Sequence, residues 1–197
     1  RGIGFIFSAA DFDSDVPYLV MDGVLEAHIK LMAELRRKAR LSTVGITGST
    51  GKTSTKEMLY HVLSQAYETG RNVRNTNVQI NIGQHIQDFR EWEQIYIQEI
   101  GGGRVGGASR HSRMVLPDVA VITNIGDAHI ANFGGSRERL LENKLGIADG
   151  LKDSGILYLN GDDPLLSKVK PEDLPVAGGA SGAPGASGDQ QASGTTS

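Results

Sequence analysis

The chain has 197 residues and a formal net charge of −3, so its charge gives no reason to expect a nucleic-acid partner. It contains no cysteine, which excludes disulfides and thiolate metal sites and suits a cytoplasmic protein. No apolar run approaches the length of a membrane span, so we expect no membrane partner. Because residue 1 is arginine rather than methionine, we expect a fragment or a processed form.

The first forty residues predict two short strands followed by a helix. Residues 2–7 and 17–21 are apolar and typical of strands, and an acidic loop at residues 11–15 separates them. In residues 24–39 apolar positions recur at helical spacing in two neighbouring stripes, which predicts a helix with a wide apolar face. The helix ends in a basic cluster that we interpret as a solvated helix end, where cations complement the helix dipole: Arg36, Arg37, Lys38 and Arg40.

From residue 43 onwards, predicted strands and helices alternate along the chain. The strands fall at residues 43–47, 94–100, 119–123 and 156–160, and the helices at residues 52–67 and 136–151. This alternation is typical of an α/β fold with a mostly parallel sheet flanked by helices. From residue 178 the sequence is rich in glycine, serine and alanine without apolar periodicity, which predicts a disordered tail.

A glycine-rich turn lies between the strand at 43–47 and the helix that begins near Lys52. Such a turn directs backbone N–H groups towards one point at the positive end of the helix dipole, where a phosphate can bind. Lys52 would reach the terminal phosphates, and the Thr53 hydroxyl would ligate Mg²⁺. Ile46 stands where the common phosphate-loop pattern has glycine, so a plain glycine-rich loop is the alternative. The order of strand, turn, Lys-Thr and helix favours the phosphate loop.

Polar residues also follow the other predicted strands. Glu99 lies near the end of one strand, Asn124 ends the next with His129 in the loop beyond, and Asn160 ends the last. Ligands of open α/β sheets bind at the carboxyl ends of the strands, where a carboxylate could hold Mg²⁺. Taken singly, Glu99 could be a solvated strand end, His129 a capping or core histidine, and Asn124 a turn residue. Their position beside a phosphate loop favours a shared site.

Lys144 lies three or four residues from most of the apolar positions of its helix, on or at the edge of the inward face. One interpretation is a snorkelling lysine whose stem packs while its ammonium reaches solvent. The other is a desolvated lysine whose amine has a lowered pKa and can react. The local sequence leaves both open.

Residues 47–58 resemble the ATP loop of the Mur ligase family, and the continuation Thr55-Lys56-Glu57-Met58 is most like its MurF type. Further family motifs follow in order over residues 2–175: Glu99-Ile100-Gly101, the run 117–129, Phe133-Gly134, Lys144 and 160–164. The resemblance implies that residues 1–40 end a smaller α/β N-terminal substrate-binding domain. Residues 41–177 would then be an incomplete central ATP-binding domain, followed by the tail at 178–197.

In that family, ATP phosphorylates a carboxylate, and an amine then attacks the acyl phosphate to form an amide. The resemblance therefore implies an ADP-forming ligase of peptidoglycan precursor synthesis that uses ATP and Mg²⁺. Its substrates would be a UDP-MurNAc-peptide and D-Ala-D-Ala, and we expect a cytoplasmic monomer. Two metals and a lysine would screen the repulsion between phosphate and carboxylate.

The resemblance also implies roles for particular residues. Lys52, Glu99, His129 and Lys144 would be catalytic, and Asn77 would contact the substrate. Thr53 and Glu99 would bind the first Mg²⁺, and His129 with a carbamylated Lys144 would bind the second. ATP would be held by Thr47, Gly48, Ser49, Thr50, Gly51, Lys52, Thr53, Ser54, Asn124 and Asn160.

The sequence departs from the family pattern mainly where the acceptor substrate is expected. Gln79 and Ile80 stand where paired asparagines are usual, and Gly107 and Gly146 where glutamate is common. Two alternatives therefore stay open. One is another ligase of the superfamily, of the folylpolyglutamate or a non-muropeptide type, and the other is a nucleotide-binding module without ligase activity. Because the domain that brings the amine is not encoded in it, we expect this chain alone to bind ATP weakly and to catalyse no ligation.

Overall fold

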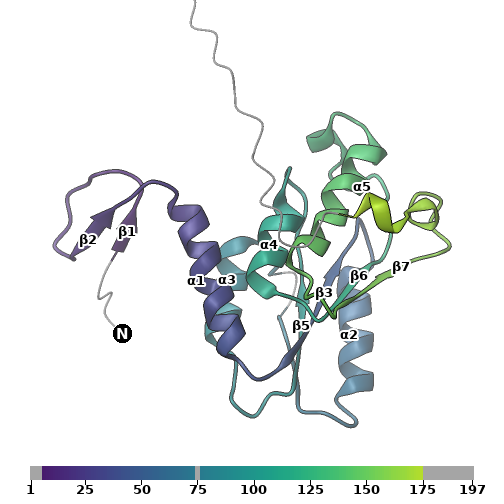
Figure 1. The fold of residues 1–197 in the computed structure, drawn as a ribbon, viewed down its shortest axis with the longest axis horizontal. Helices are drawn as coiled ribbons and strands as arrows, with labels where there is room; N and C mark the ends of the chain where they lie inside the picture. Colours follow the sequence, from purple (N-terminus) through teal and green to yellow (C-terminus); the bar gives the residue numbers. More distant parts are fainter. Residues whose placement is uncertain (1–5, 74–75, 175–197) are drawn as a thin grey trace, which may run out of the picture.

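The computed structural model describes residues 6–73 and 76–174. The predicted tail and most of the predicted strand at residues 2–7 lie outside these ranges. Within them the chain forms a two-stranded sheet and a five-stranded sheet (Figure 1). None of the helices in the two ranges combines the length and the apolar character needed to cross a membrane.

The small sheet pairs β1 (Ile6–Ser8) with β2 (Tyr18–Val20) in parallel. It lies at one end of the molecule, and α1 (Val24–Lys38) connects it to the rest of the chain (Figure 1). The strand predicted at residues 17–21 and the helix predicted at 24–39 are thus confirmed. The assignment of residues 1–40 to a separate substrate-binding domain stays a prediction.

The five-stranded sheet has the order β4-β5-β3-β6-β7, and each neighbouring pair is parallel. The α/β fold predicted from the alternation of elements is confirmed. The strands are β3 (Ser42–Thr47), β4 (Thr69–Arg71), β5 (Ile95–Glu99), β6 (Val119–Ile122) and β7 (Ile156–Leu159). Only β4 was not predicted, because three residues including a glycine carry no readable alternation.

Strand register places the ends of four strands at one edge of the sheet. Ile46 is opposite Glu99, Thr47 is opposite Ile122, and Ile122 is opposite Leu159. The segments that follow β3, β5, β6 and β7 therefore leave the sheet side by side. This arrangement bears out the prediction that the polar strand ends meet at a single edge.

Helices cover both faces of the large sheet. The helix α2 (Lys52–Leu63) packs Leu59, Tyr60 and Leu63 against a cluster of Val44, Ile46 and Ile97 on one face. The opposite face is covered by α1 with α3 (Gln79–Gln87), α4 (Gly107–Val115) and α5 (Arg137–Leu145), over a larger apolar core. Figure 1 shows these layers, with α1, α3 and α4 side by side. Four short 3₁₀ helices complete the described chain: η1 (Ile130–Phe133), η2 (Gly146–Gly150), η3 (Leu166–Lys168) and η4 (Pro171–Asp173).

Two predicted helices are shorter than their apolar patterns indicate. The helix predicted at 52–67 ends at Leu63, and its expected apolar face is only half covered, since Met58 and Val62 are about two-thirds exposed. The helix predicted at 136–151 ends at Leu145 and continues as the tighter turn η2. At this point Gly146 packs closely against Ser109 of α4, so the approach of α4 accompanies the change of helix type.

The prediction of a solvated basic end of α1 is borne out for Arg37, Lys38 and Arg40, which are exposed, and is wrong for Arg36. Arg36 is only 1% exposed. Its Nε donates to the carbonyl of Val115 at 3.0 Å, and its Nη2 donates to Asp118 Oδ2 at 3.0 Å and to Thr43 Oγ1 at 3.1 Å. The carbonyl at the end of α4 and the carboxylate before β6 supply partners that the local sequence does not reveal. This guanidinium fastens α1 to the amino-terminal edge of the large sheet.

We expect Arg36→Met to lower the free energy of unfolding by about 2–4 kcal/mol, because the buried polar groups that face Arg36 lose a charged partner. Arg37→Met is the matched control, since Arg37 is exposed and pairs with Glu34 of its own helix. The control should cost less than about 1 kcal/mol. Urea denaturation measures both, and equal losses would contradict the role assigned to Arg36.

Candidate active site

The turn between β3 and α2 has a backbone that requires glycine. Gly48 has φ +145° and Gly51 has φ +79°, and side chains are strained in both conformations. A Cβ atom at Gly48 would also clash with the Thr123 hydroxyl. Ile46, which stands where the common pattern has glycine, is fully buried within β3. The departure at Ile46 thus lies in the strand and leaves the turn intact.

The loop after β6 holds this turn in place. The N–H groups of Ser49 and Thr50 donate to the carbonyl and to Oδ1 of Asn124, both at 3.0 Å. Asn124 Nδ2 donates to Thr50 Oγ1 at 2.9 Å, and Thr123 Oγ1 donates to the Thr50 carbonyl at 2.6 Å. Asn124 therefore shapes the loop, and the expected direct contact of its side chain with a nucleotide stays a prediction.

The first turn of α2 has the features of an anion-binding site. Its first N–H groups have no partner within the helix, and they sit at the positive end of the helix dipole. No acidic residue occurs in this first turn. Since the N–H groups of Ser49 and Thr50 are already bonded, the groups left for a phosphate are those at the start of the helix, from Gly51 to Ser54.

Lys52 lies folded over the loop. Its Nζ donates to the carbonyl of Gly48 at 2.7 Å and to that of Ser49 at 3.3 Å. Burial lowers the pKa of Lys52, and the nearby charge of Glu99 acts in the opposite direction. Lys52 and Glu99 therefore belong to one electrostatic site, as their positions at the ends of β3 and β5 predict.

Glu99 is fully buried at the end of β5, with Lys56 Nζ 3.1 Å from its Oε1. This contact is an ion pair without hydrogen-bond geometry, and within the described part of the chain neither carboxylate oxygen accepts a hydrogen bond. Thr47 Oγ1, at the end of β3, is likewise buried without a partner there. Buried polar atoms left unpaired are costly. Mg²⁺ prefers oxygen ligands, and Glu99 and Thr47 place oxygen atoms that have no hydrogen-bond partner among the described residues beside the phosphate loop.

Lys144 on α5 is 2% exposed, so it is a desolvated lysine and not a snorkelling one. Its Nζ lies 3.0 Å from the position that a Cβ atom on Gly102 would occupy, beneath the glycines that follow β5. Burial lowers the pKa of Lys144 to about 8, and repulsion from Lys52 adds to the effect. With a pKa of about 8, a minor fraction of this amine, about a tenth, is neutral at pH 7, and this neutral form is the one that the reactive interpretation requires.

His129 and Asn77 line one groove of about 630 Å³ on the surface beside Lys144. His129 is exposed, with φ +65°, and its ring lies against Gly103. The Asn77 carbonyl accepts a hydrogen bond from the Gly101 N–H at 2.9 Å, which ties the groove to the end of β5. The other cationic or titratable side chains of the groove are Arg104, Arg110 and His111.

The remaining predicted residues take different places. Thr53 lies exposed in the first turn of α2. Asn160 Nδ2 donates to the Thr123 carbonyl at 3.0 Å and so joins the ends of β7 and β6. Over residues 6–73 and 76–174, no three His, Asp or Glu side chains lie close enough to hold a metal ion by themselves. A metal here would need further ligands, such as phosphate oxygens, and both predicted Mg²⁺ sites stay predictions.

Sequence reasoning missed three residues that build the site. Lys56 and Asn72 contact Glu99, and Asp163 joins two loops by accepting the Ile125 N–H at 2.8 Å. Burial alone would raise the pKa of Asp163, but bonds from three backbone N–H groups outweigh it and lower the pKa. For Lys56 one signal was present, because a residue four positions after Lys52 lies on the same side of α2.

The chain combines a strand, a glycine turn and a helix with a buried lysine and a buried carboxylate at the carboxyl edge of a parallel sheet. This combination defines an α/β domain of the P-loop class. Residues 46–178, most of the chain, match the family described as the Mur ligase middle domain. The chain therefore belongs to the Mur ligase family.

Individual relatives agree with this assignment and with the resemblance to the MurF type. The chain is 37% identical over 151 residues to UDP-N-acetylmuramoyl-tripeptide–D-alanyl-D-alanine ligase of Bacillus subtilis, a match that covers 77% of this chain and 33% of the relative. It is similar to the crystal structure of MurF ligase from Thermotoga maritima in complex with ADP, with TM-score 0.77 and 30% identity over 88% of this chain and 40% of the other. The crystal structure of MurF from Acinetobacter baumannii is also similar, with TM-score 0.74 and 30% identity over 82% of this chain and 36% of the other. The chain thus spans about a third of the length of the curated relatives it matches.

Proposed function

We propose that the protein carrying this chain is an ATP-dependent ligase that joins UDP-N-acetylmuramoyl-tripeptide to D-Ala-D-Ala in peptidoglycan precursor synthesis. The observation that carries the proposal is the buried, incompletely paired carboxylate of Glu99, which shares one site with Lys52 and the phosphate loop. The names of the relatives supply the substrates. A cytoplasmic location accords with the cysteine-free sequence, and the monomeric state stays a prediction.

The phosphates of ATP would bind at the N-terminus of α2. Their oxygens would accept from the N–H groups between Gly51 and Ser54, and Lys52 would exchange its carbonyl partners for the terminal phosphate. Thr53 and Glu99 would hold the first Mg²⁺. When bound, this ion would supply the positive charge that lowers the repulsion between the phosphate and an incoming carboxylate.

The carboxylate substrate would approach through the groove of Asn77 and His129. Arg104 and Arg110 give this groove positive charge, which suits an anionic substrate. Lys144 lies beneath the adjacent glycines, and its lowered pKa leaves neutral amine that can react with CO₂. The amine nitrogen would form a bond to the carbon of CO₂ and lose one proton to solvent, giving a carbamate. This would replace a cation by an anion with two oxygen ligands, and with His129 it would hold the second Mg²⁺.

We expect Glu99→Gln to raise the Mg²⁺ concentration needed for half-maximal ATP turnover by about tenfold or more, because an amide oxygen is a weaker ligand for a hard cation than a carboxylate. Glu93→Gln is the matched control, since Glu93 is also buried but lies before β5, at the opposite edge of the sheet. An Mg²⁺ titration of each variant measures the effect. An unchanged titration for Glu99→Gln would mean that Glu99 is only a structural strand end.

Phosphate release by the full-length gene product tests the function itself. With ATP and UDP-N-acetylmuramoyl-tripeptide present, release should depend on D-Ala-D-Ala, and an amide product should form in equal amount. Dependence on a folate acceptor with glutamate would instead identify the folylpolyglutamate type of ligase. Nucleotide binding without amine-dependent release under any of these conditions would identify a binding module and overturn the proposal.

A further inference from the structure

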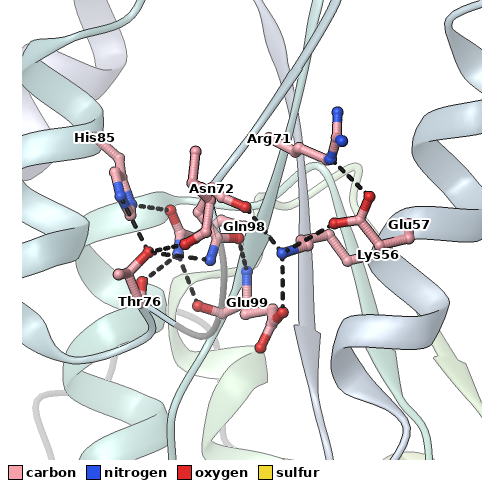
Figure 2. Close-up of polar contacts among 9 residues, drawn as sticks. Lys56, Glu57, Arg71, Asn72, Thr76, His85, Gln98 and Glu99 are labelled. Carbon is pink, nitrogen blue, oxygen red and sulfur yellow. Dashed lines mark hydrogen bonds and ion pairs between the residues drawn. The ribbon is translucent and has the colours of Figure 1, made fainter.

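The helix α2 carries two lysines one turn apart, and the phosphate-loop motif accounts for only the first. Lys56 is 0% exposed, although lysine is rarely buried. Its Nζ lies 3.1 Å from Glu99 Oε1, 3.3 Å from Glu57 Oε1 and 2.9 Å from the carbonyl of Asn72 (Figure 2). The ammonium is thus held between α2, the end of β4 and the end of β5.

Asn72 forms a second link between Lys56 and Glu99, in addition to their direct ion pair. While its backbone carbonyl accepts from Lys56, its side-chain Oδ1 accepts from the Glu99 N–H at 2.8 Å (Figure 2). Asn72, Lys56 and Glu99 therefore close a ring of contacts in which both the backbone and the carboxylate of Glu99 are fixed. The carbonyl of Glu99 is also held, by Gln98 Nε2 at 2.8 Å.

Stability alone does not explain why this pair is buried. Two buried charges lose their hydration, and replacing such a pair by apolar residues often leaves a protein equally stable or more stable. The pairing here is also one-sided, because Lys56 faces Oε1 while Oε2 has no hydrogen-bond partner among the described residues. Lys56 starts one helical turn further from the phosphate loop than Lys52, so it can engage the carboxylate without occupying the anion site.

We propose that Lys56 is a positioning residue for Glu99. Its ammonium holds Oε1 and fixes the plane of the carboxylate, so that Oε2 is presented to the cation that enters with the nucleotide. Lys56 itself touches neither nucleotide nor metal. The inference rests on the proposed function, because it requires that Glu99 be a ligand of that cation. Partners that orient metal ligands in this way commonly change metal affinity by about 10–100-fold when they are removed.

The test compares two buried cations in the full-length protein. Lys56→Met removes the ammonium beside Glu99, and the control Arg36→Met removes the buried guanidinium at the other edge of the sheet. Binding of a fluorescent ADP analogue is titrated with Mg²⁺ and repeated without it. Lys56→Met should raise the Mg²⁺ midpoint by about tenfold or more and leave metal-free nucleotide binding within about twofold. Arg36→Met should change neither, although both variants lose stability.

A second pair of variants keeps the proposal testable if Lys56→Met does not fold. The double variant Lys56→Met/Glu99→Gln removes the charge of Glu99 together with that of Lys56, so the buried Glu99 carboxylate is not left without its partner. Its Mg²⁺ midpoint should equal that of Glu99→Gln alone, since Lys56 acts only through Glu99. Lys56→Arg keeps a cation beside Glu99, so its Mg²⁺ midpoint should lie closer to the wild-type value than that of Lys56→Met.

Three outcomes overturn the inference. One is an unchanged Mg²⁺ midpoint in Lys56→Met while Mg²⁺ strengthens binding to the wild type. Another is a double variant in which the two shifts add. If Mg²⁺ does not strengthen nucleotide binding by the wild type at all, the proposed function fails together with the role of Lys56.

Discussion

Lys52→Ala is expected to reduce ATP turnover by the full-length protein at least about 10²–10³-fold, because the cation that screens the transferred phosphate is lost. The fold should survive this change. Among the described residues, Lys52 bonds only to carbonyls of its own loop, and burial lowers its pKa because it disfavours the charged form. Turnover is measured under single-turnover conditions, and the melting temperature reports the fold.

Lys152→Ala serves as the control for this substitution, because Lys152 is an exposed lysine that pairs with Asp118 at the opposite edge of the sheet. It should retain wild-type turnover. Wild-type turnover in Lys52→Ala would show that the turn after β3 is not a phosphate loop that acts in catalysis.

Lys144→Ala should lose most of the ligase activity, about 100-fold or more, because the proposed carbamate can no longer supply oxygen ligands. Short-chain carboxylic acids should restore part of it by filling the space left beneath Gly102. The amine reacts with CO₂ only when neutral, so in the wild type carbamylation should increase with bicarbonate and as the pH rises towards the lowered pKa of about 8.

The same lowered pKa gives a stability signature when CO₂ is excluded. The folded state disfavours the charged amine, so the penalty is fully present below pH 8 and fades as the pH rises to the ordinary value of 10.5. Lys144→Ala should lack this dependence, and Lys168→Ala, which alters an exposed lysine, should keep it. Full activity in Lys144→Ala would make the lysine structural and end its role in the proposed mechanism.

The features that the sequence predicts are those that short segments determine. β-branched runs mark β3, β5 and β6, and the glycines of the phosphate loop are required by their own backbone angles. Because parallel strands end at one edge, the site could be placed as soon as the strands were recognised. The helix α4 was missed because much of its buried side consists of small residues, Gly107, Ala108 and Ser112, so that it shows no stripe of large apolar side chains.

Burial of charged residues could not be predicted, because it depends on partners far away in the chain. Arg36 meets Asp118 across 82 positions, and Lys56 meets Glu99 only after β5 has paired with β3. In an isolated helix both cations are typical of a solvated surface. The interpretation of Lys144 was left open for the same reason, since the glycines that cover it follow a different strand.

Because Asn124 bonds to the phosphate loop, the loop loses its conformational entropy when the protein folds and not when a ligand binds. Fixing the backbone of one free residue costs about 1–2 kcal/mol, and a loose glycine-rich loop would incur this loss each time a ligand ordered it. Here Ser49 and Thr50 are already immobilised by Asn124 and Thr123. This loss of entropy therefore occurs on folding, and a phosphate bound at this loop would meet N–H groups that are already aligned. Such a loop would bind its ligand with little change in its own order, so any larger rearrangement during turnover would have to come from other parts of the molecule.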